Sequence, residues 1–205
     1  MKFNIGVILT AAVMLLTGCL GIRQAQPPIE YYTPEYDPPN IGESAPLPLT
    51  LKIEPFVTSP VYDSTRIAYT SRNFKRNEYA THRWRAVPGE LVGALLARDF
   101  AHASLFKAVV LSESVPACSH LLTGTVEEFY LRSDNDRREA VLSVSITLSS
   151  LMSKDVQDAV LFQKRYAYRE ICLQQTPEAF VEAMSRALRQ LSAHSIPDVY
   201  QRLIK

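Results

Sequence analysis

The sequence predicts an α+β fold, in which an antiparallel or mixed β-sheet of about five to six strands carries two main α-helices on one face. Three long stretches, LLTGTVEEFY, EAVLSVSITLSSL and AVLFQKRYAYREI, combine alternating apolar and polar residues with many β-branched or aromatic side chains. Turn-rich segments, SDNDRR and MSKDVQD, separate these strands, which favours antiparallel neighbours. Two other stretches repeat apolar residues at helical spacing.

The chain begins with a short apolar run, MKFNIGVILTAAVMLLTGC. A helix of about twelve residues rises roughly 18 Å, less than the roughly 30 Å of a hydrocarbon core, so the run is typical of a cleaved signal. Residues 16–19, LTGC, match the bacterial lipobox, whose cysteine receives a diacylglyceryl group before cleavage. We expect residues 1–18 to be a lipoprotein signal peptide and Cys19 the lipid-bearing N-terminus. An ordinary secretory signal or an uncleaved anchor is the alternative.

Residues 19–48 contain seven of the thirteen prolines, which predicts a semi-extended tether between lipid and domain. Inside it, YYTPEYDPP contains Tyr31, Tyr32 and Tyr36. This is more aromatic surface than a spacer needs, so part of the segment is expected to dock as an edge strand or to bind a partner. A disordered tether with incidental tyrosines is the alternative.

From Leu49 the alternation LTLKIEPF predicts a strand, and IAYTSR and YATHRW predict a hairpin around RNFKRNE. Six cations lie on this hairpin or beside it: Arg66, Arg72, Lys75, Arg76, Arg83 and Arg85. Such a basic hairpin could touch anionic lipid or an acidic partner, and simple solvation is the alternative. Trp84, between Arg83 and Arg85, suits an interface hot spot, although a lone tryptophan is at least as often a core residue.

The remaining elements follow from local signals. The spacing of Val92, Leu96 and Phe100 after Pro88-Gly89 predicts a helix over 90–106, and FKAVV predicts a short strand. The strand EAVLSVSITLSSL should have one buried and one wet face. Thr176-Pro177-Glu178 is a strong helix start, and Pro197 should break or kink that helix before a last short turn.

The totals fit one exported domain over residues 49–205. The chain has 22 basic and 21 acidic residues, and the signal takes Lys2 away, so the mature chain is formally neutral and does not resemble a nucleic-acid binder. Export favours a disulfide between Cys118 and Cys172. In a simple meander, however, these cysteines lie at opposite ends of the sheet, which favours two separate thiols.

The sequence shows no catalytic or metal motif. Its four histidines are scattered, and it has no Cys-x-x-Cys, no G-x-S-x-G and no phosphate-binding glycine loop. The acidic residues Glu127, Glu128, Asp134 and Asp136 are expected beside turns, as solvated charges. We therefore predict a protein that is not an enzyme, with no metal and no cofactor other than the diacylglycerol and N-acyl (palmitate-type) lipid on Cys19.

The chain resembles the ABC-type transport auxiliary lipoproteins, which include the PqiC-like lipoproteins. The resemblance is carried by the lipobox, YYTPEYDPP, LTLKIEPF, the segment from IAYTSR through Arg83-Trp84 to the first helix, Leu105-Phe106 with Val109, and FVEAMSRALRQL. Pro34 stands where the family usually has leucine, and the Cys118/Cys172 pair is not a general feature of the family.

The resemblance implies a small α/β domain and a periplasm-facing lipoprotein with no catalytic residues. Its implied partners are an inner-membrane ABC transporter and its mammalian-cell-entry (MCE) type periplasmic subunit, which move lipid between two membranes. Leu20, where enteric bacteria use Asp for inner-membrane retention, favours the outer membrane. We expect an adaptor or assembly component, with homo-oligomers a further option. The alternatives are a periplasmic lipid carrier and a tethered enzyme or cell-wall synthase activator.

Overall fold

A computed structural model describes residues 27–42, 44–72, 75–111, 118–134, 137–153, 155 and 159–204. The expected signal peptide, Cys19 and the first part of the expected tether lie outside the described residues. Within these ranges, none of the helices is long and apolar enough to cross a membrane.

The described elements are nine strands and two helices. The strands are β1 (Glu30–Tyr32), β2 (Leu47–Ile53), β3 (Val57–Thr58), β4 (Arg66–Arg72), β5 (Lys75–Trp84), β6 (Phe106–Val110), β7 (His120–Asp134), β8 (Arg137–Ser150) and β9 (Val160–Ile171). The helices are α2 (Pro88–His102) and α4 (Pro177–Leu203).

All of these strands form one mixed sheet built around β7. One edge of β7 pairs with β8 along its whole length, and β8 pairs with β9, both antiparallel. The other edge is shared in succession by β2, β3 and β4, all parallel to β7. Beyond them, β6 extends β2, and β5 with β1 extends β4. The predicted α+β class is confirmed, but the count of five to six strands is wrong. The seven segments predicted as strands one by one all form strands, and β1 and β3, which are too short to show an alternation, bring the number to nine.

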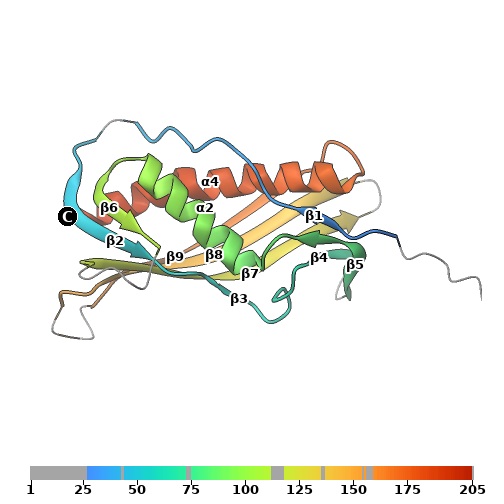
Figure 1. The fold of residues 1–205 in the computed structure, drawn as a ribbon, viewed down its shortest axis with the longest axis horizontal. Helices are drawn as coiled ribbons and strands as arrows, with labels where there is room; N and C mark the ends of the chain where they lie inside the picture. Colours follow the sequence, from blue (N-terminus) through green and yellow to red (C-terminus); the bar gives the residue numbers. More distant parts are fainter. Residues whose placement is uncertain are drawn as a thin grey trace, which may run out of the picture.

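The two helices lie on the same side of the sheet (Figure 1). Their apolar stripes share one core with the inner faces of the central strands, and Phe100, Leu142 and Phe180 are among its fully buried members. Both helices begin at a proline, Pro88 and Pro177. The start at Pro177 is as predicted, whereas α2 begins two residues before and ends four residues before the predicted range 90–106. Thr176 caps α4, its Oγ1 accepting a hydrogen bond from the amide of Ala179 at 3.2 Å.

Helix α4 continues through Pro197 to Leu203, so the predicted break at that proline is wrong. Proline removes one backbone donor and costs about 3 kcal/mol inside a helix. On either side of this proline, however, Ile196 and Val199 are completely buried, and the hydroxyl of Tyr200 donates to the carbonyl oxygen of Ala45 at 2.8 Å. Tertiary packing of the last turn offsets the local cost.

The face of the sheet away from the helices is only partly wet. Along β8, Val141 and Ser143 on this outer face are 3% and 0% exposed, so the predicted wet face is wrong for the first half of the strand. A small second cluster of Tyr62, Ala68, Tyr130 and Val141 accounts for part of this burial. The segment between β3 and β4 therefore covers the outer face near β7.

Cys118 and Cys172 are both free thiols. Cys118 precedes β7, whose start pairs with the end of β8, whereas Cys172 follows β9 at the end where Glu139 pairs with Ile171. The two cysteines therefore lie at opposite ends of the long strands, too far apart to be bridged. Of the two alternatives, a disulfide and two separate thiols, the structure shows the second.

Candidate functional site

A β-bulge in β7 brings two carboxylates together on the outer face of the sheet. The register with β8 shifts between Val126 and Glu128, so Glu127 is the extra residue. Arg165 on β9 contacts the carboxylates of both Glu127 and Glu128, which places them on the same face. These two acids lie in mid-strand, and their predicted place beside a turn is wrong.

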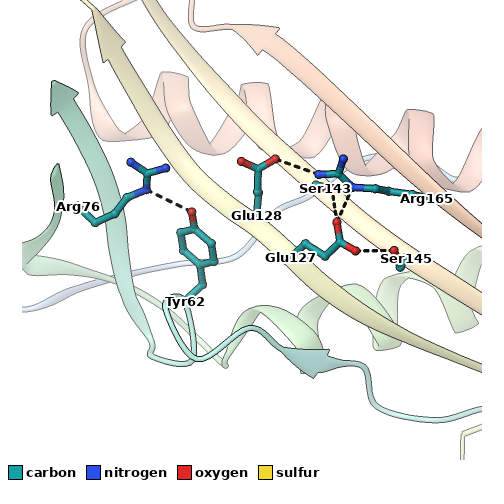
Figure 2. A network of polar contacts seen from close by, with 7 residues as sticks. All are labelled: Tyr62, Arg76, Glu127, Glu128, Ser143, Ser145 and Arg165. Atoms are coloured by element: carbon teal, nitrogen blue, oxygen red, sulfur yellow. Dashed lines mark hydrogen bonds and ion pairs between the residues drawn. The ribbon is translucent and has the colours of Figure 1, made fainter. Parts of the chain in front are cut away.

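Glu127 is held by three partners (Figure 2). The hydroxyls of Ser143 and Ser145 donate to its two carboxylate oxygens, at 3.0 and 2.5 Å, and Nε of Arg165 donates at 2.5 Å. These bonds, that of Ser145 first, lower the pKa of the Glu127 carboxyl. Arg165 also lies 3.6 Å from a carboxylate oxygen of Glu128.

A cation and two stacked tyrosines lie next to this network. The rings of Tyr62 and Tyr130 are 5.7 Å apart and parallel within 2°, and the guanidinium of Arg76 lies 4.6 Å from the Tyr130 ring centre. Nε of Arg76 also donates to the Tyr62 hydroxyl at 3.3 Å (Figure 2). A groove of about 570 Å³ runs between these groups and Glu127. We call Tyr62, Arg76, Glu127, Glu128, Tyr130 and Arg165 the outer-face site.

The tyrosine segment docks on the domain. Its first residues form β1, which pairs with β5 in parallel as an edge strand. The hydroxyl of Tyr32 lies 2.8 Å from Glu30, 3.1 Å from Glu178 at the start of α4 and 3.4 Å from His82. Burial, and then these two acids, raise the pKa of Tyr32. Pro34 is buried, so the departure from the family's leucine does not prevent docking.

Further along, the segment lies across α2 and α4, seen in blue in Figure 1. The amide of Glu35 donates to Oγ of Ser185 at 3.0 Å, and the Tyr36 hydroxyl donates to Asp99 at 2.8 Å. We call residues 30–41 the N-terminal segment. A groove of about 460 Å³ runs between it and α4, lined by Tyr32, Tyr36, Glu182, Arg186 and Arg189 among others.

The structure separates the six predicted partner-binding residues. Trp84 is 1% exposed and packs on Phe129 and Phe180, so its prediction as an interface hot spot is wrong. Tyr32 and Tyr36 are part-buried in contacts within the chain. Tyr31 is 51% exposed and its ring lies 5.2 Å from the guanidinium of Arg85, so these two stay accessible.

Arg83 is half-buried between β4 and β1. Its Nε is buried and has no hydrogen-bond partner among the described residues. Its strand lies between two others, and its side chain is only partly accessible to a partner.

The outer-face site has the chemistry of recognition. Its charges are fixed by hydrogen bonds and alternate in sign, which gives a rigid polar surface that can specify a partner. Among the residues that the structure describes, no three histidine, cysteine or acidic side chains gather as a metal site.

Sequence reasoning missed the outer-face site although a signal was present. In LLTGTVEEFYL the buried positions Leu122, Val126, Phe129 and Leu131 keep an even spacing except between Val126 and Phe129. This gap of three indicates one inserted residue, hence a bulge at Glu127-Glu128. The partners of Glu127 on β8 and β9 could not be predicted from the residues around it, because they are distant in the sequence.

Comparison with known families decides the identity. Residues 35–194 match the model of the ABC-type transport auxiliary lipoprotein component. The chain belongs to this family. Among curated proteins, none matches the sequence. For the ABC-type transport auxiliary lipoproteins, the name itself describes a membrane-anchored protein that assists a transport system.

Solved structures share the fold of this auxiliary lipoprotein. The protein XCC0632 from Xanthomonas campestris has a TM-score of 0.74 at 14% identity, covering 84% of this chain and 95% of its own. The hypothetical protein CT253 from Chlamydia trachomatis has a TM-score of 0.52 at 8% identity, covering 75% and 96%. At these identities the likeness shows the fold alone.

Proposed function

We propose that this auxiliary lipoprotein is a non-catalytic adaptor of an ABC/MCE-type lipid transport system, anchored at the periplasmic side of the outer membrane through lipidated Cys19. Its partners are the MCE-type periplasmic subunit and the inner-membrane ABC transporter. The acyl groups on Cys19 are its only cofactor, and each buried CH₂ contributes about 0.8 kcal/mol to membrane binding.

The observation that carries the adaptor role is the outer-face site. The helices cover the other face of the sheet (Figure 1), and beside the β3–β4 segment the side chains of Arg76 and Arg165 stay exposed to a partner. Glu127 and Arg165 are already fixed by their neighbours, so binding would cost little side-chain ordering. Arg76, exposed beside the buried rings of Tyr62 and Tyr130, is of a residue type enriched in interfaces.

The lipid-carrier alternative is less well supported. A carrier needs an apolar cavity of several hundred cubic ångströms around its cargo. Here the helix-facing side of the sheet is filled by buried side chains. The outer-face groove is open and lined by charged side chains such as Arg76 and Arg132.

The test is affinity purification of the full-length lipoprotein from membranes, followed by mass spectrometry of protein and lipid. We expect ABC and MCE-type subunits to be recovered. The charge reversal Glu128→Lys should lower their recovery at least about tenfold, since a repulsive pair at an interface costs several kcal/mol. The matched control is Arg189→Glu, which reverses the charge of an exposed residue on α4. Thermal unfolding checks that both variants fold.

Two results would count against this proposal, the first against the contact site and the second against the adaptor itself. Recovery of transporter subunits that neither substitution changes would remove the outer-face site from the contact. Stoichiometric lipid on the unacylated chain, without transporter subunits, would favour the carrier.

A further inference from the structure

Several strand ends meet at one end of the molecule. The register pairs Arg72 with Lys75 at the β4–β5 turn, Asp134 with Arg137 at the β7–β8 turn, and Glu139 with Ile171 at the end of β9. The start of the described chain and the loop from β9 to α4 lie at this same end, at the right of Figure 1.

This end is basic. Its strand ends contain Lys75, Arg132, Arg137, Arg138 and Arg169, which we call the anchor-end cations, against the three acids Asp134, Glu139 and Glu170, the last of which is paired with Arg186. Two further acids, Glu30 and Glu178, meet at the Tyr32 hydroxyl beside the start of α4. Glu139 is buried and paired with Arg137 at 2.7 Å, and Asp134 lies 3.8 Å from Arg132. Lys75 and Arg169 are exposed. The described strand ends therefore carry more cations than acids, although the mature chain is formally neutral.

Exposed apolar side chains lie at the same end as these cations. Ile29 is 44% exposed, Ile171 is 51% exposed and Leu173 is 78% exposed. Cations next to exposed aliphatic side chains suit the headgroup region of a bilayer, where the aliphatic groups reach the acyl boundary and the cations stay at the phosphates.

The chain length places this end near the lipid anchor. The N-terminal segment is fixed to the domain from Glu30 onward, so it does not act as a spacer. Seven residues lie between Cys19 and Pro27, and the eight Cα–Cα steps that join the two can span at most about 28 Å. A lipidated Cys19 thus keeps the anchor end, where the described chain begins, close to the membrane.

We propose that the anchor end binds the surface of a bilayer containing anionic phospholipids. The phosphate groups would neutralise the anchor-end cations, and Leu173 and Ile171 would enter the headgroup layer. The argument from chain length rests on Cys19 as the anchor, as in the proposed function, whereas the argument from charge does not. Docking in this way points the opposite end, with the C-terminus of α4, away from the membrane.

The test uses the mature chain, residues 19–205, with Cys19→Ser, so that binding cannot come from the acyl groups. Co-sedimentation is measured at low salt with vesicles of phosphatidylglycerol and phosphatidylcholine in about equal parts, and with phosphatidylcholine alone. We expect binding to the anionic vesicles only, reversed by salt. The double variant Lys75→Glu/Arg169→Glu should lower binding at least about tenfold.

The matched control reverses the same number of charges elsewhere, in Lys107→Glu/Arg189→Glu, and should bind far more strongly than the anchor-end variant. Equal loss in both variants, or no preference for anionic vesicles, would overturn the proposal. The anchor-end variant could instead bind vesicles normally but recover fewer transporter subunits in the purification from membranes. The anchor end would then bind a protein, so the lipid proposal would be rejected and the adaptor role kept. If the protein binds vesicles as expected but no transporter subunits are recovered from membranes, the binding of the anchor end to lipid is supported and the adaptor role is rejected.

Discussion

The phenol of Tyr36 donates a hydrogen bond to the buried carboxylate of Asp99 across 2.8 Å, joining the N-terminal segment to a helix 63 residues later. Asp99 is 1% exposed and also accepts from Ser192 on α4 and from Nε of Arg98. The guanidinium of Arg98 lies 4.5 Å from the Tyr36 ring centre. One carboxylate therefore ties the N-terminal segment, α2 and α4 together.

Removing the Tyr36 hydroxyl tests this junction. Tyr36→Phe deletes one hydrogen bond to a buried charge, which is worth about 1.5–3 kcal/mol, and leaves Asp99 with fewer donors. We expect the free energy of unfolding in urea to fall by about that amount. The control Tyr31→Phe, on a ring that is half exposed, should change it by less than about 0.5 kcal/mol. Equal effects would show that the N-terminal segment is not fixed at Tyr36.

Trp84 should behave as a core residue. Its ring is 5.2 Å from that of Phe129 and 5.6 Å from that of Phe180, measured between centres. Trp84→Ala leaves a large cavity and should lower the free energy of unfolding by about 3–5 kcal/mol. Arg85→Ala, one residue on and exposed, is the control and should cost less than about 0.5 kcal/mol. A stable Trp84→Ala protein that loses its partners would instead restore the hot-spot reading.

The elements that the sequence predicts well are those that depend on nearby residues. The cap at Thr176, the stripe of Val92, Leu96 and Phe100, and the short strand Phe106–Val110 all follow from local spacing. Their apolar periodicity gives the face that each element buries, and no distant partner has to be known.

The features that the sequence does not predict depend on distant partners. Trp84 looks like a surface residue between two arginines until Phe129 and Phe180 are placed over it. Pro197 looks like a helix break because burial of Val199 is not visible locally. The outer-face site likewise needs Arg165 from β9 beside Glu127 from β7, a pairing that only the sheet register supplies.

Two glycines of α2 should respond in opposite ways to alanine. A Cβ on Gly89 would meet the carbonyl oxygen of Phe56 at 1.9 Å, whereas one on Gly93 has its nearest neighbours at 3.4 Å. Gly89→Ala should therefore destabilise the protein strongly. Gly93→Ala should be neutral or stabilising by up to about 1 kcal/mol, because alanine favours the helix. Chemical denaturation of both variants checks the pair, and a tolerated Gly89→Ala would contradict the close contact.

The cysteines should behave as two separate thiols. Burial raises the pKa of the Cys172 thiol, whereas Cys118 is half-buried and less shielded. Iodoacetamide at mildly alkaline pH should alkylate Cys118 faster than Cys172 in the folded chain, because the thiolate is the nucleophile. Peptide mass spectrometry measures both rates, and dithiothreitol should leave the thermal midpoint unchanged. An intramolecular Cys118–Cys172 peptide in the non-reduced digest would contradict the structure.

Glu127 should make part of the stability depend on pH. Its carboxyl has a lowered pKa, chiefly through Ser145 and then Arg165. This contribution is fully present above the pKa of unfolded glutamate, about 4.3, and is lost as the pH falls through the lower pKa of the folded protein. Unfolding free energies of the wild type and Glu127→Gln should thus differ by a constant amount above about pH 5 and converge in acid. Glu128→Gln is the control and should differ less from the wild type, because its contact with Arg165 spans 3.6 Å. A difference for Glu127→Gln that persists unchanged in acid would mean that packing, and not charge, holds the bulge.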